Sequence, residues 1–340
     1  MDLNRRDFGK LALAAAAASA APAASLAGKP DSKFDGVQIG TITYSYRGEP
    51  GVNDAATLLK MVVASGISAI ELMPPDAEAF AGAPVQTGGG GGGRAGGPGG
   101  RGASGGRGGG GGGRAPMTPE QQAAQAAAAE TLKKWRLSAS MDKFKEFRKM
   151  YNDAGVSIYC HKLAPSPSMS DDEFDYMFTV AAALGAKQVS LELTDAGPYT
   201  QRLGDFAYKH GMVAAYHAHE QATITAWDAV LAQSKGNAVN IDCGHYYAGT
   251  GISPVPALEK LHDRIASAHL KDRTPTTPGG RGANLPWGQG STPIAEILQA
   301  AKKNKWTFPF SVELEYQVPA DSNAVIEVKK CVEYCRSCLA

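Results

Sequence analysis

The feature that most constrains the fold of this chain is a regular alternation of short apolar runs with longer amphipathic segments. The strand-like runs lie at residues 37–45, 67–73, 156–163, 186–193, 212–219, 237–244, 264–271 and 309–316. The segments with helical periodicity lie at residues 53–66, 141–155, 170–185, 223–234, 254–263 and 293–305. Several of these end in glycine directly before a strand, which is typical of a helix C-terminus. Strands that alternate with helices form parallel βαβ units.

Eight such strands predict an α/β protein with a closed (β/α)8 TIM barrel rather than an open doubly wound sheet. No G-x-G-x-x-G motif follows the first strand, which disfavours a dinucleotide-binding fold. Apolar residues make up 43% of the 340 residues, which is enough for one large core. We expect the barrel to span residues 35–340, with one interruption after its second strand.

Residues 82–116 form the predicted interruption, and their central part reads GGGGGGRAGGPGGRGASGGRGGGGGG. Such a segment buries too little apolar surface to offset the entropy cost of ordering it, so we expect a disordered insertion. Its arginines resemble those of RNA-binding segments, but no aromatic residues accompany them, which favours a solvated linker. The formal net charge of +1 likewise gives no reason to expect nucleic acid as a partner.

Residues 1–28 carry the pattern of a secretory signal. Arg5 and Arg6 precede Phe8 and Lys10, and an alanine-rich run that ends in small residues follows. This order resembles the twin-arginine export motif, so we predict that the twin-arginine machinery exports the folded protein to the periplasm. The alternative is a short helix with an incidental arginine pair. Elsewhere in the sequence no apolar stretch is long enough to span a bilayer.

Cysteine usage is compatible with either redox environment. The five cysteines are Cys160, Cys243, Cys331, Cys335 and Cys338. An odd number leaves at least one unpaired within a monomer. The C-terminal CVEYCRSC has no second Cys/His pair at zinc spacing nearby, which disfavours a structural metal there. An oxidising compartment would permit a disulfide.

Polar side chains able to bind a metal or move a proton follow nearly every predicted strand. They are Glu71, His161, Lys162, Glu192, His217, His219, Asp242, His245, His269, Lys271, Asp272, Glu313 and Glu315. In a (β/α)8 barrel the reactive groups lie at the C-terminal ends of the strands. Any one of these residues alone is more often a hydrogen-bonded rim group than a ligand. Together they are predicted to converge on one mouth.

The mixture of carboxylates and imidazoles suits a hard or borderline divalent ion such as Mn²⁺, Mg²⁺, Co²⁺ or Zn²⁺. A metal flanked by spare acid and base groups can bind a hydroxy-ketone and stabilise an enediolate. Two further polar groups, one on each face of the reacting carbon, would then move the proton. The strand ends therefore predict metal-assisted chemistry on a polyhydroxylated substrate.

The order of several short motifs along the chain adds a resemblance to a known family. They read IGTITYSY, IELMP, KWRLS, DAGVSIYCHK, HAHE, IDCGHYYAGTG, HLKDR and SVELEY. In this order they resemble the xylose isomerase-like barrel superfamily, in its sugar phosphate isomerase/epimerase branch. The resemblance runs from about Val37 to the C-terminus, with the glycine-rich segment as an interruption.

The resemblance implies a metal set on the later strands. Asp242 resembles the family's metal aspartate, and His269 and Glu313 complete the set, with Glu315 as the fallback for Glu313. Many relatives supply a fourth ligand from a glutamate on strand five. This sequence has His217 there, so Glu192 on strand four is the predicted carboxylate.

The remaining strand-end residues are predicted to serve catalysis or substrate binding. The predicted catalytic residues are His245, Lys271, His219 and Glu315. The predicted substrate-binding residues are Glu71, His161, Lys162 and His217. His245 in particular resembles the family's substrate-contacting histidine.

The resemblance implies a divalent-metal-dependent isomerase or epimerase that acts on a sugar or keto-sugar through an enediolate. Export argues against a phosphorylated substrate and favours a free sugar or a glycoside. The alternatives are a metal-dependent lyase or dehydratase of 3-keto-glycosides and a non-catalytic sugar-binding barrel. An abasic-site endonuclease is disfavoured because it would need more histidine ligands and a basic surface. A homo-oligomer is compatible with the sequence.

Overall fold

A computed structural model describes residues 28–74, 76–84, 118–277 and 280–340. The predicted signal up to residue 27 and the predicted insertion from residue 85 to residue 116 lie outside these ranges. No helix in the described ranges has both the length and the apolar character needed to cross a membrane.

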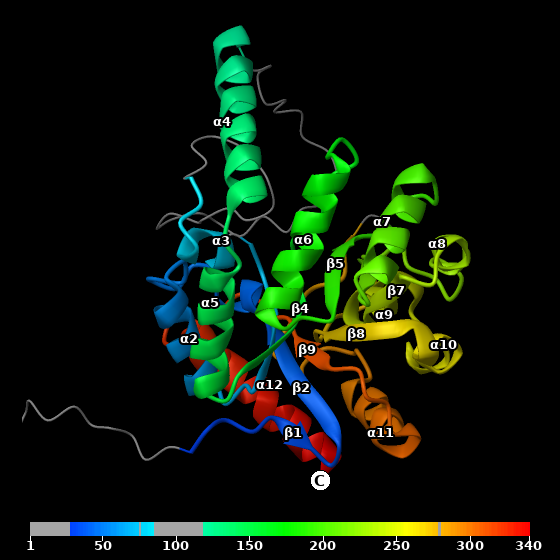
Figure 1. Ribbon diagram of the computed structural model, residues 1–340. Helices are drawn as coiled ribbons and strands as arrows, with labels where there is room; N and C mark the ends of the chain where they lie inside the picture. The colour runs from blue at the N-terminus through cyan, green and yellow to red at the C-terminus, as the bar shows by residue number, and fades with distance from the viewer. Residues whose placement is uncertain (1–27, 75, 85–117, 278–279) are drawn as a thin grey trace, which may run out of the picture.

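Eight parallel strands form a closed barrel (Figure 1). They are β2 Val37–Ile42, β3 Ala69–Leu72, β4 Ser157–His161, β5 Gln188–Glu192, β6 Val213–His217, β7 Asn237–Asp242, β8 Ile265–Leu270 and β9 Phe310–Val312. Each strand pairs with the next, and β9 closes the circle on β2 through the register Ile39 with Phe310. A short strand β1 (Lys33–Phe34) adds an antiparallel edge to β2. Every strand of the predicted barrel is confirmed.

Helices surround the barrel. They are α2 Ala55–Ala64, α3 Asp76–Phe80, α4 Pro119–Ser138, α5 Asp142–Asp153, α6 Asp171–Leu184, α7 Pro198–Lys209, α8 Asp228–Gln233, α9 Cys243–Thr250, α10 Val255–Leu261, α11 Ile294–Asn304 and α12 Ala324–Leu339, with 3₁₀ turns η1 Thr43–Tyr46 and η2 His262–Arg264. The predicted helical segments all contain a helix. The helical segments predicted from the apolar spacing did not include α3, α4, α7, α9 or α12.

Helix α6 shows how local sequence and packing agree. Ser170 caps its N-terminus by accepting from the backbone N–H of Glu173, and Gly185 ends it in the left-handed conformation with φ 87°. Between these ends the helix buries Phe174 and Phe178 against the barrel wall. The capping chemistry sets the length of the helix, and the burial of its apolar face orients it.

Helix α4 behaves differently, because none of its residues is fully buried. Figure 1 shows that it projects beyond the other helices. Its alanine-rich sequence and its capping box at Thr118 favour the helix without help from packing. Its C-terminal part is anchored: Lys133 forms an ion pair of 3.1 Å with Glu173 of α6, and the guanidinium of Arg136 donates two hydrogen bonds of 2.7 Å to the carboxylate of Glu78.

The five cysteines are all unpaired. Cys331 and Cys335 lie on α12 and are buried in the core. They therefore act as packing residues, and the disulfide that an oxidising compartment would permit is absent from the fold.

Candidate active site

Four side chains from neighbouring strands form what we call the inner group: His217, Asp242, His269 and Glu313. One nitrogen or oxygen from each lies within 4.8 Å of the others, and all four residues are buried. The strand register explains this convergence, because Asp242 lies opposite His269 in the pairing of β7 with β8. His217 ends β6 and Glu313 directly follows β9, at the same end of the barrel.

Glu71 orients the ring of His269. Its Oε2 lies 2.8 Å from Nε2 of His269, and its Oε1 accepts a hydrogen bond of 2.6 Å from Ser190. Glu71 is fully buried on β3 and does not line the mouth. The sequence predicted a substrate-binding residue here. The structure instead places Glu71 behind His269, whose Nδ1 faces Glu313 Oε2 at 2.8 Å.

Lys271 supplies a positive charge at the centre of the acids. Its Nζ lies 2.9 Å from Asp242 Oδ2, 2.9 Å from Glu313 Oε2 and 2.8 Å from Glu315 Oε2. The side chain is only 2% exposed, so water cannot replace these partners. A buried ammonium is tolerated where several carboxylates compensate it.

Burial and charge compete in this group, and charge wins at most positions. Burial alone would lower the pKa of His269, but Glu71 and Glu313 raise it to about 10. Burial would raise the pKa of Glu313, yet Lys271 and His269 hold it well below its usual range. His217 is the exception, because burial and the nearby cation of Lys162 push its pKa well below the usual value. His217 is therefore a neutral imidazole with a lone pair.

The formal charges leave room for a cation. The carboxylates are Glu71, Asp242, Glu313 and Glu315, and the cations are Lys271 and the protonated His269. Four negative and two positive charges leave two negative charges uncompensated, and the nearby cation of Lys162 is balanced by its own partner, Glu192. Asp242 Oδ2 is also buried without accepting a hydrogen bond, although the ammonium of Lys271 lies nearby.

These residues fit a divalent ion. Two carboxylates and two imidazoles are donors that such ions accept. A carboxylate behind a ligating imidazole, as Glu71 stands behind His269, is the usual support for a metal-binding histidine. The donor set, the uncompensated negative charge and the supporting carboxylate all fit a divalent ion in the inner group.

Glu192 lies outside the inner group, although the sequence predicted it as the fourth ligand. It ends β5, its side chain is 51% exposed, and Lys162 Nζ and His219 Nδ1 lie 3.2 and 3.3 Å from its two oxygens. We call Lys162, Glu192 and His219 the rim group. Lys162 and His219 hold the Glu192 carboxylate at the edge of the mouth. The fourth residue of the inner group is His217.

His161 is not brought together with the other predicted substrate-binding residues. It ends β4 and is buried, and the charges that act on it are Glu78 and Arg136 rather than those of the mouth. Burial lowers the pKa of His161 to about 4, and its Nδ1 has no hydrogen-bond partner in the described chain. It lies among the helices that pack against β4.

The turn from Asp242 to His245 joins the inner group to the open mouth. Asp242 Oδ1 accepts a hydrogen bond of 2.7 Å from the N–H of His245 and so caps helix α9. Its other oxygen faces Lys271. Gly244, in the turn between Asp242 and His245, must lack a side chain because a Cβ there would lie 2.2 Å from Cγ of Lys271.

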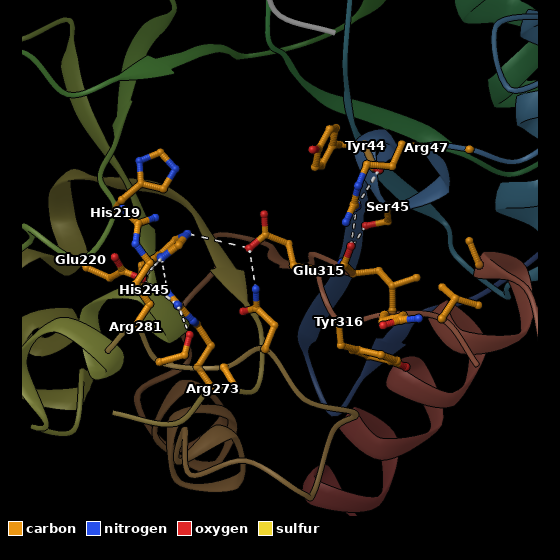
Figure 2. A pocket seen from close by; sticks show the side chains of 18 of the residues that line it. Tyr44, Ser45, Arg47, His219, Glu220, His245, Arg273, Arg281, Glu315 and Tyr316 are labelled. Carbon is orange, nitrogen blue, oxygen red and sulfur yellow. Dashed lines mark hydrogen bonds and ion pairs between the residues drawn. The ribbon is translucent and has the colours of Figure 1, made fainter. Parts of the chain in front are cut away.

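A cavity of about 1180 Å³ opens beside the inner group (Figure 2), and none of the four inner-group side chains lines it. Its lining includes Tyr44, Arg47, His219, Glu220, His245, Arg273, Arg281, Glu315 and Tyr316. Three of the predicted catalytic residues thus line the cavity, and Lys271, which does not, contacts Glu315 of the lining. His219 and His245 stand with ring centroids 4.6 Å apart and, with His217, form a second group of nearby imidazoles.

The sequence interpretation missed several polar residues of this mouth, among them Glu220 and Arg273. Both line the cavity, and Asp272 anchors its loop by accepting from the backbone N–H groups of Gly288 and Gly290 at 2.8 and 2.9 Å. Gly290 cannot carry a side chain, since a Cβ would lie 2.2 Å from Asp272 Oδ1. The motifs HAHE and HLKDR contain Glu220 and Arg273, so the signal was present.

Solved structures share the fold at low sequence identity. A sugar phosphate isomerase/epimerase from Parabacteroides distasonis superposes with a TM-score of 0.54 and 15% identity, covering 88% of this chain and 95% of that chain. The probable 3-DHS dehydratase of petrobactin synthesis from Bacillus anthracis gives 0.55 and 13%, covering 87% and 98%. A D-psicose 3-epimerase from Clostridium cellulolyticum gives 0.53 and 11%, covering 89% and 99%.

No curated protein matches the chain. Residues 121–334 match the family described as xylose isomerase-like TIM barrel, a match that covers most of the barrel. On this match and on the fold, the chain belongs to the xylose isomerase-like TIM barrel family.

Proposed function

We propose that this protein is a divalent-metal-dependent isomerase or epimerase of a sugar or keto-sugar. The observation that carries the proposal is the inner group, whose four donors gather within 4.8 Å of one another beside a large cavity that His245 and Glu315 line. The isomerase, epimerase and dehydratase names of the structural neighbours agree with this reaction class.

His217, Asp242, His269 and Glu313 would hold the ion. When bound, it would supply positive charge that stabilises negative charge on substrate oxygens. His269 must give up its Nδ1 proton to become a ligand, while Glu71 keeps the proton on Nε2. Lys271 stays as a buried cation that holds Glu315 near the cavity.

The residues around the cavity supply the acid and base groups. Glu315 and His219 line it from different strand ends, so they offer two groups for moving a proton at a substrate carbon. Burial and the neighbouring His245 lower the pKa of His219, which favours a neutral ring able to accept a proton. Removal of the proton from a hydroxyl-bearing carbon next to a carbonyl gives an enediolate, and return of the proton to the other carbon or to the other face gives an isomer or an epimer.

A second candidate reaction is elimination from a 3-keto-glycoside. The size of the cavity favours it, because about 1180 Å³ exceeds the roughly 300–1,000 Å³ of pockets for drug-sized ligands. A single sugar ring would leave much of this space to water, whereas a glycoside would fill more of it. The same enediolate would then expel the second group.

The location of the protein is part of the proposal. The Arg5-Arg6 motif supports export by the twin-arginine machinery to the periplasm, where a free sugar or glycoside is a more plausible substrate than a phosphorylated one. Replacing both arginines by lysine should retain the precursor in the cytoplasm. Normal periplasmic accumulation of that variant would contradict the export proposal.

One experiment separates the reactions. Purified mature protein is analysed for metal and then incubated in D₂O with free sugars and 3-keto-glycosides while NMR spectra are recorded. Deuterium at a sugar carbon without bond cleavage supports the isomerase or epimerase, and release of the second group supports the lyase. Sugar binding without any exchange would indicate a non-catalytic barrel and overturn the proposal. Asp242→Ala protein, purified identically, controls for contaminating enzymes.

A further inference from the structure

Arg273 is buried beside the mouth and has no contact with the inner group. It follows β8 and is only 3% exposed. Its Nη2 lies 2.6 Å from Glu220 Oε1 and donates a hydrogen bond of 2.7 Å to the carbonyl of Gly282. Its Nη1 contacts Nδ1 of His245. A carboxylate and a carbonyl therefore fix the guanidinium in place, and the ring of His245 is its third partner.

The contact between Arg273 and His245 determines which ring nitrogen carries the proton. A guanidinium has only donors and does not lose its proton in proteins. The nitrogen that faces it must accept, so Nδ1 of a neutral His245 is unprotonated and Nε2 carries the hydrogen. The Glu220 carboxylate also faces Nδ1, but its nearest oxygen lies 3.8 Å away and is bound to Arg273, so the guanidinium is the closer partner of Nδ1.

The Nε2 hydrogen of His245 has no partner within hydrogen-bond distance in the described chain. The nearest acids are Asp242 Oδ2 at 4.0 Å and Glu315 Oε2 at 3.9 Å. Figure 2 shows the ring between Arg273 and Glu315, at the wall of the cavity. This hydrogen is available to an oxygen atom of a bound substrate.

We infer that Arg273 and Glu220 are positioning residues that hold His245 as an Nε2–H donor to a substrate oxygen. In this role His245 stabilises negative oxygen charge and does not remove the proton from carbon. The assignment rests on the proposed function, and it leaves proton abstraction to Glu315 and His219. It also argues against His245 as a metal ligand through Nε2, since Nδ1 would then need a proton facing a guanidinium.

The tautomer can be measured without any substrate. ¹⁵N–¹H correlation spectra of the imidazole rings distinguish protonated from unprotonated nitrogens, and the loss of signals in His245→Gln identifies His245. We expect Nε2–H in the wild type. Arg273→Met leaves the Glu220 carboxylate as the neighbour of Nδ1, so the proton should move to Nδ1. Arg273→Lys restores a donor and should return it to Nε2.

The matched control is Arg264→Met. Arg264 also donates to backbone carbonyls, including that of Asn237 at 2.6 Å, but lies at the start of β8, away from the mouth. The Arg264→Met substitution should leave the His245 signals unchanged. Nδ1–H in the wild type, an unchanged tautomer in Arg273→Met or the same shift in Arg264→Met would overturn the inference. None of these results depends on finding the substrate, so failure of the proposed function is recognised separately.

Turnover gives a second readout once a substrate is known. Glutamine keeps a side-chain N–H donor but cannot act as a base. His245→Gln should therefore stay within about 10-fold of the wild-type rate, whereas His245→Ala should lose about 10²–10³-fold, as for a lost oxyanion donor. If glutamine is as inactive as alanine, His245 is not a donor.

Discussion

The inner group and the rim group use the same residue types in opposite environments. The inner residues Asp242 and His269 are fully buried, whereas the rim residues Glu192 and His219 have side chains about half exposed. Inside, burial by itself would lower the pKa of His269, but the carboxylates of Glu71 and Glu313 act on it without screening by water and raise it to about 10. On the rim, the same kinds of contact, at 3.2 and 3.3 Å, are screened by water.

The difference shows that the direction and burial of a side chain matter more than its residue type or its level along the strand. Glu192 and His217 lie opposite each other in the pairing of β5 with β6. Yet the side chain of Glu192 is held at the edge, and that of His217 points inward. The residues that bind the metal therefore have to be assigned from the burial and direction of their side chains. The following experiments test that assignment.

The largest effect is expected from Asp242→Ala. It removes an anionic donor from a group with two uncompensated negative charges and leaves Lys271 without one of its partners. Metal affinity should fall by more than about 100-fold, since loss of a supporting residue alone costs about 10–100-fold. Titration against a chromophoric chelator measures it. Full metal occupancy in this variant would place the ion elsewhere in the mouth.

A smaller effect, of about 3 kcal/mol, is expected on stability from His161, which is buried without a counter-charge. Its pKa of about 4 in the folded protein lies below the value of about 6.5 in an unfolded chain. The unfolded state therefore binds the proton first, and the free energy of unfolding should fall as the pH falls from about 6.5 to about 4. Urea titrations at several pH values measure this dependence.

His161→Gln provides the comparison for that measurement, because other groups also titrate in this range. The variant should lose the part of the pH dependence that His161 contributes. An identical dependence in both proteins would mean that His161 takes up a proton in the folded state at its ordinary pKa.

Glu71→Gln should lower metal affinity by about 10–100-fold, the usual cost of losing a carboxylate behind a ligating histidine. The amide no longer favours the proton on Nε2 of His269, so the ligand nitrogen is less well defined. Ser190→Ala removes only one hydrogen bond to Glu71 and should have a smaller effect. Equal affinities for wild type and Glu71→Gln would show that Glu71 does not support the site.

The smallest effect is expected from Glu192→Gln on the rim. Its exposed ion pair with Lys162 should be worth at most about 1 kcal/mol of stability, and metal affinity should stay within a few-fold of wild type. His217→Ala is the matched inner variant and should weaken metal binding strongly. The reverse ranking would restore Glu192 as the fourth ligand.

Much of the fold followed from the sequence, because each strand and most helices carry their own local signal. Alternating apolar runs and C-terminal glycines such as Gly185 depend on neighbours within a few residues. The sequence did not predict helix α9, because its residues Cys243–Thr250 directly follow strand β7 without an intervening loop. Its N-terminal cap is the side chain of Asp242, which the sequence marked only as a ligand candidate.

The sequence alone determined that polar side chains stand at the strand ends of a barrel, since that is a matter of period and chain order. Only the tertiary structure decided which of them meet. Glu71 and His269 are 198 positions apart in the chain, yet they lie 2.8 Å from each other across the barrel. The partners of Lys271, the exposure of Glu192 and the contact of Arg273 with His245 depend likewise on side-chain direction and burial, which distant elements impose through packing.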